Sequence, residues 1–209
     1  MSYTVKELFL TLQGEGMRTG RRAVFLRFAG CNLWTGREED RTGAICRFCD
    51  TDFVGMNGKN GGRYDAPTLA AKVGELWGDD RQAAYVVCTG GEPLLQLDPL
   101  LIGALHGEGF EIAVETNGTI AAPHGIDWLC VSPKAGSEVV QRTGDELKLV
   151  WPQSGIDPHE IADWDFRHFL IQPMDCEEGE AARDASLAFV DNHPSWRLSL
   201  QTHKLLGIP

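Results

Sequence analysis

The sequence lacks the features that mark a membrane or exported protein. No stretch reaches the roughly 18 apolar residues that a membrane-spanning helix needs. The first residues contain no basic segment followed by an apolar core, so the sequence predicts no signal peptide. We therefore expect a cytoplasmic protein with no membrane partner, whose six cysteines serve metal or redox chemistry rather than disulfides.

Positive charge is scarce. The 209 residues include 19 Lys and Arg against 30 Asp and Glu, which gives a formal net charge of −11. A diffusely acidic surface repels nucleic-acid phosphates, so we expect no nucleic-acid partner. Hydrophobic residues make up 43% of the chain, which is enough for one globular domain over residues 1–209.

Motifs of several common enzyme classes are also absent. The six histidines form no H-x-x-x-H or H-x-H pair, and no Ser-His-Asp set stands at a nucleophile elbow. Gly90-Gly91 is not followed by the Lys-Ser/Thr that a phosphate-binding loop requires. The sequence therefore gives no sign of a histidine metal site, a serine hydrolase or a P-loop enzyme.

The sequence does contain a group of three cysteines. Cys31 and Cys46 are separated by fourteen residues, and Cys46 and Cys49 by two. A C-x-x-C pair lets two thiolates reach one metal centre from a single turn. A structural zinc site would need a fourth ligand, and no histidine precedes His106. An iron–sulfur cluster on three thiolates would instead leave one iron open to an exogenous ligand such as S-adenosylmethionine.

Short apolar strands recur along the chain, and from Tyr85 onward each ends in a polar or small motif. The expected strands are Val5–Thr11, Ala23–Phe28, Tyr85–Cys88, Glu111–Glu115, Trp128–Val131, Glu146–Val150, His168–Ile171 and Arg197–Thr202. Functional groups at strand carboxyl ends are typical of β/α barrels. Helices are expected at Ala66–Trp77 and within Leu95–Gly107 and Glu177–His193, whereas other connections are too short. We therefore predict an α/β fold, a partial, open TIM-like barrel of parallel strands with fewer helices than strands.

Seven short motifs carry a resemblance to one family. They are Leu12-Gln13-Gly14-Glu15-Gly16, Arg27-Phe28-Ala29-Gly30-Cys31-Asn32-Leu33, Cys49-Asp50-Thr51-Asp52, Glu115-Thr116-Asn117-Gly118, Ser132-Pro133-Lys134, Gln172-Pro173-Met174-Asp175 and Gln201-Thr202-His203-Lys204. Together with Phe48 and the GGE motif Thr89-Gly90-Gly91-Glu92-Pro93, they resemble the 7-carboxy-7-deazaguanine synthases of the radical S-adenosylmethionine superfamily. The superfamily's usual cysteine motif is C-x3-C-x2-C. The wider first gap here, Asn32–Ile45, also occurs in some members of that family.

The resemblance implies a lyase that converts 6-carboxy-5,6,7,8-tetrahydropterin to 7-carboxy-7-deazaguanine with loss of ammonia, a precursor step toward queuosine. Its cofactors would be a 4Fe-4S cluster, S-adenosylmethionine and Mg²⁺. Its partners would be the small-molecule pterin, an electron donor of unknown identity and, in a homodimer, a second copy of the chain. No side chain is expected to act as acid or base, because the cofactors carry the chemistry.

The resemblance also assigns residues to each ligand. The cluster would bind Cys31, Cys46 and Cys49, and magnesium would bind the Thr51 hydroxyl. S-adenosylmethionine would contact Phe48, Asp50, Gly91, Ser132, Pro133, Lys134, Gln172, Pro173, Met174 and Asp175. The substrate would contact Leu12, Gln13, Gly14, Arg27, Thr89 and the terminal carboxylate of Pro209. Apart from the resemblance, Gln13–Gly16 reads as an ordinary turn and Asp50–Asp52 as a turn or helix cap.

Two other functions fit parts of the sequence. A radical activase that generates a glycyl radical on a partner protein would share the cluster and the GGE motif. A non-catalytic zinc-binding module would use the cysteines alone.

Three further segments carry expectations of their own. The polar insertion Asn32–Ile45 is expected to expose its charges, with a short helix within it. Cys88 and Cys130 are expected to be buried, and Cys176 has no assigned role. The apolar residues of the tail from His203 onward predict that it packs against the fold.

Overall fold

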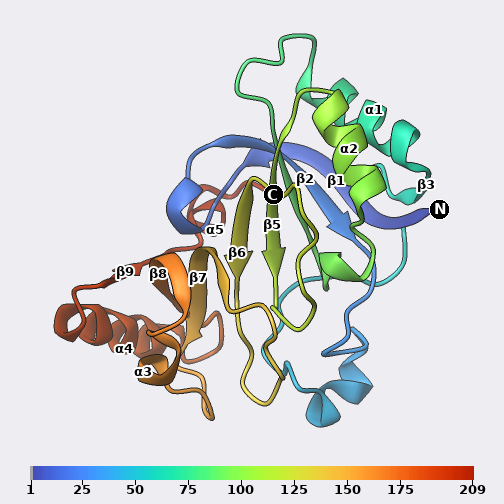
Figure 1. The fold of residues 1–209 in the computed structure, drawn as a ribbon. Coiled ribbons are helices and arrows are strands. Elements are labelled where there is room, and N and C mark those ends of the chain that lie inside the picture. Colours follow the sequence, from blue (N-terminus) through green and yellow to red (C-terminus); the bar gives the residue numbers. More distant parts are fainter. Residues whose placement is uncertain (1) are drawn as a thin grey trace.

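The computed structural model describes residues 2–209, which form one nine-stranded sheet with helices at its two ends (Figure 1). The strand order is β3-β1-β2-β4-β5-β6-β7-β8-β9. The strands are β1 (Tyr3–Leu12), β2 (Arg22–Phe28), β3 (Gly62–Tyr64), β4 (Tyr85–Gly90), β5 (Glu111–Thr116), β6 (Trp128–Val131), β7 (Thr143–Trp151), β8 (Asp165–Pro173) and β9 (Trp196–Leu198). The two edge strands do not pair with one another, so the sheet is an open barrel, as predicted.

From β2 to β9 the neighbouring strands are parallel, whereas β1 runs antiparallel to both β2 and β3. The antiparallel pairing departs from the expected all-parallel barrel. Its cause is the short connection from Gln13 to Arg21, because a parallel crossover needs a dozen or more residues. The parallel strands place all their carboxyl ends at one edge, where the polar motifs gather.

Five α-helices and three 3₁₀ helices lie in the described chain, so α-helices are fewer than strands, as predicted. They are η1 (Gly16–Arg18), η2 (Glu38–Gly43), α1 (Ala66–Trp77), η3 (Pro93–Leu95), α2 (Pro99–Gly107), α3 (Pro158–Ile161), α4 (Gly179–Asn192) and α5 (Thr202–Leu206). Figure 1 shows α1 and α2 side by side near β1, and α3 and α4 beside β8 and β9. No helix in the described chain is both long and apolar enough to cross a membrane.

The sequence of helix α1 explains both where the helix begins and which face it buries. Asp65 caps it by accepting a hydrogen bond from the Thr68 amide at 2.9 Å, and Pro67 stands in the first turn. Leu69, Val73 and Trp77 recur at helical spacing and are buried against the sheet. The predicted helix Ala66–Trp77 is confirmed.

The C-terminal end differs from the sequence prediction. The strand predicted at Arg197–Thr202 is shorter and lies at Trp196–Leu198, and Thr202 begins helix α5. Leu205 and Leu206 are 76% and 64% exposed, so the prediction that apolar residues hold the tail is wrong for this pair. Polar contacts hold residues 201–209 instead, as described below. The short helix predicted within the insertion is η2, and none of the residues of η2 is buried. Leu33 and Trp34, at the start of the insertion, are buried.

Candidate functional site

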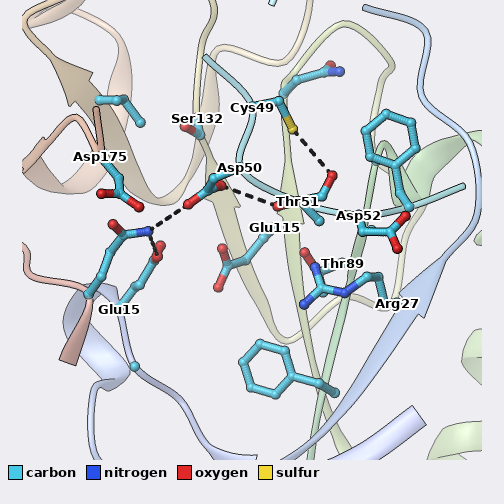
Figure 2. Close-up of a pocket in the computed structure, with 18 of the residues that line it drawn as sticks. Glu15, Arg27, Cys49, Asp50, Thr51, Asp52, Thr89, Glu115, Ser132 and Asp175 are labelled. Atoms are coloured by element: carbon cyan, nitrogen blue, oxygen red, sulfur yellow. Dashed lines mark hydrogen bonds between the residues drawn. The ribbon is translucent and has the colours of Figure 1, made fainter. Parts of the chain in front are cut away.

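A cleft of about 400 Å³ opens at the carboxyl ends of the parallel strands. Nearly every site residue assigned by resemblance lies in its wall; Pro133 and Met174 do not. Met174 instead donates its amide to the Trp151 carbonyl at 2.8 Å. Figure 2 shows Asp50, Asp175 and Glu15 along one side of the cleft, and Arg27, Thr89 and Asp52 along the other.

The three predicted cluster cysteines are free thiols in this wall. A hydrogen bond from the Cys46 thiol to Cys49 raises the pKa of Cys46 and lowers that of Cys49 to about 6. Burial raises the pKa of Cys31. Across residues 2–209, no three His, Cys, Asp or Glu side chains are grouped closely enough to hold a single metal ion. The three thiols therefore lie in one wall of the cleft as candidate ligands of the predicted cluster.

The insertion shapes the cysteine loop through Arg41. One guanidinium nitrogen donates to the Arg47 carbonyl at 2.9 Å and to the Cys49 carbonyl at 3.1 Å. The same guanidinium lies 4.0 Å from the centroid of the Trp34 ring. The insertion thus fixes the backbone on both sides of Phe48, a role that its charged sequence did not reveal.

Gly91 lets the end of β4 approach the cysteine loop. A Cβ at this position would lie 2.2 Å from the Gly30 carbonyl oxygen and 2.6 Å from Cys31 Cβ. The amide of Glu92 also donates to the Gly30 carbonyl, at 3.0 Å. Close backbone contact at Gly91 therefore sets the position of Cys31.

The Glu92 carboxylate is fully buried and does not line the cleft. It accepts hydrogen bonds from the Leu94 amide, the Thr116 hydroxyl and the Asn117 amide at 2.7–2.9 Å. Burial raises its pKa despite these donors. The acidic residue of the GGE motif thus ties the carboxyl ends of β4 and β5 together.

A network of buried polar side chains forms the floor of the cleft. Lys148 on β7 donates to Glu15 at 2.5 Å and to Glu115 at 3.0 Å. Gln13 donates to the other oxygen of Glu115 at 2.8 Å, and Gln201 to the other oxygen of Glu15 at 3.0 Å. Burial raises the pKa of Glu15, but the charge and hydrogen bond of Lys148 outweigh this effect and hold it at about 2. The network keeps Glu15 as an anion and holds the Glu115 carboxylate in the cleft wall.

Sequence reasoning assigned no role to Lys148, Glu115 or Gln201. A signal was present in Glu146–Val150, where charged residues alternate with Leu147 and Leu149. Alternation along a strand places the charged residues on one face, and in a barrel the inward face surrounds the site.

A second lysine, Lys6 on β1, supports the segment after Thr51. Its ammonium donates to Asp52 at 2.6 Å, to the Asn57 side chain at 2.7 Å and to the Val54 carbonyl at 2.9 Å. The Thr51 hydroxyl is left beside Asp50, at 3.5 Å, in the cleft wall (Figure 2). The hydroxyl is thus presented to the cavity from a segment that is fixed on both sides.

Arg27 and Lys134 are two further cations of the wall. The Nε of Arg27 donates to Glu7 at 2.8 Å, which leaves its terminal nitrogens facing the cleft without a hydrogen-bond partner among residues 2–209. Lys134 donates to the Ser132 carbonyl and hydroxyl, both at 2.7 Å, and lies 5.9 Å from the centroid of the Phe48 ring. Burial lowers the pKa of Lys134.

Comparisons with known proteins agree with this geometry. No family model matches the chain. Proteins described as 7-carboxy-7-deazaguanine synthase from Bradyrhizobium diazoefficiens, Caulobacter vibrioides and Bordetella pertussis are 59%, 58% and 57% identical to it, each over the whole of both chains. The crystal structure of QueE from Escherichia coli superposes with a TM-score of 0.68 at 25% identity and covers 96% of this chain and 94% of that one.

The open barrel and its three-cysteine wall define a radical S-adenosylmethionine lyase. Within that class, the chain belongs to the 7-carboxy-7-deazaguanine synthase family. The resemblance inferred from the seven motifs is thereby confirmed, as is the expected fold.

Proposed function

We propose that the cleft converts 6-carboxy-5,6,7,8-tetrahydropterin to 7-carboxy-7-deazaguanine with loss of ammonia, a step toward queuosine. The observation that carries this proposal is that three free thiols and a fixed polar floor face one cavity of about 400 Å³. A cavity of this size suits a small substrate beside a nucleoside cofactor. A protein partner, as an activase would require, has no comparable support in the cleft.

Cys31, Cys46 and Cys49 would hold the 4Fe-4S cluster. Their fit rests on the donor set: three thiols in one wall, one of them with a pKa of about 6 that favours the thiolate. When bound, the cluster and S-adenosylmethionine supply one-electron chemistry that starts a radical reaction on the substrate. An oxygen-sensitive cluster also requires a reducing compartment, which supports the expectation of a cytoplasmic enzyme.

The wall from Phe48 to Asp175 would hold S-adenosylmethionine. Phe48 offers a face for adenine, and the backbone at Gly91 lies next to the cysteine loop, where the methionine amino group would bind. The direct contacts would come from Asp50, Ser132, Lys134, Gln172, Pro173 and Asp175, all of which line the cleft. Pro133 and Met174 lie outside the wall and would support their neighbours.

The opposite side of the cleft would bind the pterin. The terminal nitrogens of Arg27 would grip its carboxylate in a bidentate manner. Gln13, Glu15 and Glu115 present amide and carboxylate groups suited to the donors and acceptors of the ring. Leu12, Gly14, Thr89 and Pro209 complete that side of the wall.

Thr51 would supply a hydroxyl oxygen to Mg²⁺, and water and substrate oxygens would complete the coordination. Its place in the wall beside Asp50 supports this role. The substrate is thus expected to be held by a cation as well as by side chains. An electron donor and a homodimeric assembly remain expectations from the family, and sedimentation would establish the subunit number.

The test is an anaerobic assay of the cluster-loaded protein with reductant, S-adenosylmethionine, magnesium and the carboxytetrahydropterin, in which the product is followed by mass. We expect 7-carboxy-7-deazaguanine from the wild type and from Cys176→Ala, because Cys176 is exposed and lies outside the cleft wall. Cys49→Ala should abolish it. Cleavage of S-adenosylmethionine that leaves the pterin intact would overturn the substrate assignment, and loss of activity in Cys176→Ala would overturn the cysteine assignment.

A further inference from the structure

The C-terminal segment, residues 201–209, connects the two sides of the cleft. The Thr202 amide and hydroxyl both donate to the Gly14 carbonyl at 2.9 Å, and the Thr11 hydroxyl donates to the Pro209 carbonyl at 2.9 Å. A Cβ on Gly14 would lie 2.2 Å from Nδ1 of His203, so this side chain presses directly on the predicted substrate loop. The segment therefore forms part of the wall on the substrate side.

Lys204 attaches the same segment to the predicted cofactor side. Its ammonium donates to Asp50 at 2.6 Å and also to Asp175. Asp50 directly follows the last cluster cysteine, and Asp175 follows β8. One ammonium thus joins two loops that are distant in sequence, and a single oxygen of each carboxylate receives the hydrogen bond.

Polar contacts rather than burial hold helix α5 in place. It has five residues, too few for a stable isolated helix, and buries none of them. Besides Lys204, the segment reaches the cofactor side through Gln201, which donates to the same Asp50 oxygen at a longer distance, 3.4 Å. The ion pair is therefore a principal contact between the C-terminal segment and the cofactor side.

We propose that Lys204 is a positioning residue that couples the two sides of the cleft, so that S-adenosylmethionine, by ordering Asp50 and Asp175, also orders residues 201–209 over the substrate. This inference rests on the proposed function, because it requires S-adenosylmethionine to bind beside both carboxylates. Lys204 takes no part in the chemistry. Its effect is on the affinity for the pterin.

The first test is hydrogen exchange of the cluster-loaded protein without reductant, with and without S-adenosylmethionine. In the wild type we expect exchange to slow in peptides covering both 46–50 and 201–209, the latter by about tenfold. In Lys204→Met, protection should persist at 46–50 and disappear at 201–209. Lys204→Arg should restore it, because a guanidinium also bridges two carboxylates.

The second test is kinetic. Lys204→Met should raise the KM for the pterin about tenfold while kcat stays within about twofold, the pattern of lost binding rather than lost chemistry. Lys72→Met is the matched control, because Lys72 has a similar exposure (35% against 38%) and, within residues 2–209, pairs with Glu75 on α1 alone. Exposed ion pairs contribute little to global stability, so both variants should fold.

The outcomes separate this inference from the proposed function. Equal protection of 201–209 in wild type and Lys204→Met, or none there in the wild type while 46–50 is protected, would overturn the coupling alone. If S-adenosylmethionine slowed hydrogen exchange nowhere in the cleft, both the coupling and the assignment of the S-adenosylmethionine site would be overturned. Coupled protection in a protein that leaves the pterin unchanged would support the role of Lys204 and overturn the substrate.

Discussion

At the scale of single residues, the cleft depends on charges that are costly to bury. Lys148 is 4% exposed at its side chain and lies between Glu15 and Glu115, whose side chains are 16% and 22% exposed. A buried ion pair stabilises the fold little more than apolar side chains in place of all its members would. Removal of one partner, in contrast, leaves the charge of the others buried without a counter-charge. Replacing Lys148 alone should therefore lower the stability of the fold more than replacing all three residues together.

Replacing Lys148 with Met should lower the free energy of unfolding at pH 7 by about 3–5 kcal/mol, since two carboxylates lose their cation. Because the folded-state pKa of Glu15 is about 2 against an ordinary 4.5, its pairing stabilises the protein above pH 4.5, and this stabilisation is lost as the pH falls through 2. The deficit of the variant should thus shrink toward low pH. Urea unfolding at several pH values measures it, and a deficit that is constant with pH would contradict the charge explanation.

Replacing Thr51 with Ala should weaken the response to magnesium and spare the cluster. Loss of one oxygen ligand is expected to raise the magnesium concentration for half-maximal activity about tenfold, or ~1.4 kcal/mol. The control is the iron and sulfide content, which should match the wild type. An unchanged magnesium response would remove Thr51 from the metal site.

Some residues of the cleft could be predicted from the sequence, and others could not. Cys31, Cys46 and Cys49 were predicted as cluster ligands because they stand within motifs that resemble one family, and the structure places all three in the cleft wall. Lys148 was missed because the alternation in its strand indicates a shared face but not a partner, and its partners Glu15 and Glu115 lie 133 and 33 residues away. Only the folded barrel brings these three together.

At the scale of elements, the turn after β4 and the cysteine loop form one unit. Gly91 and Gly30 are in direct contact, and Glu92 fastens the same turn to β5. The parallel strands were predictable because each apolar run ends in a polar motif. The tail was not, because its leucines suggested packing while Thr202 and Lys204 supply the contacts.

Replacing Gly91 with Ala should reduce cluster content, because the new Cβ would overlap the Gly30 carbonyl and displace Cys31. We expect iron and sulfide after reconstitution to fall to about half or less, as for a distorted ligand shell. The matched control is Gly103→Ala in α2, where nothing lies within 4 Å. That change should keep full cluster content and stabilise the helix by about 0.5–1 kcal/mol. Normal cluster content in Gly91→Ala would show that the contact of Gly91 with Gly30 does not set the position of Cys31.

At the scale of the whole molecule, the net negative charge disfavours binding to the tRNA that the pathway is expected to modify. Nineteen basic residues against thirty acidic ones leave a surface that repels phosphate. The enzyme is expected to handle the free pterin rather than a base within RNA. The open end of the barrel has room for that small molecule.

We therefore expect no measurable binding of tRNA at physiological salt, with a dissociation constant above about 10⁻⁴ M. Fluorescence anisotropy of labelled tRNA against the cluster-loaded protein measures it, with a basic protein of similar size as positive control. Micromolar, salt-dependent binding would show that a local basic surface outweighs the net charge.

The contact between Thr202 and Gly14 has a consequence for how the enzyme is made. A chain leaves the ribosome from its N-terminus, so β1, β2 and the three cysteines emerge long before residues 201–209. The strands from β4 to β9 lie in the sheet in the order in which they occur along the chain. The cysteine loop therefore leaves the ribosome well before Thr202, whose contact with Gly14 completes the wall on the substrate side.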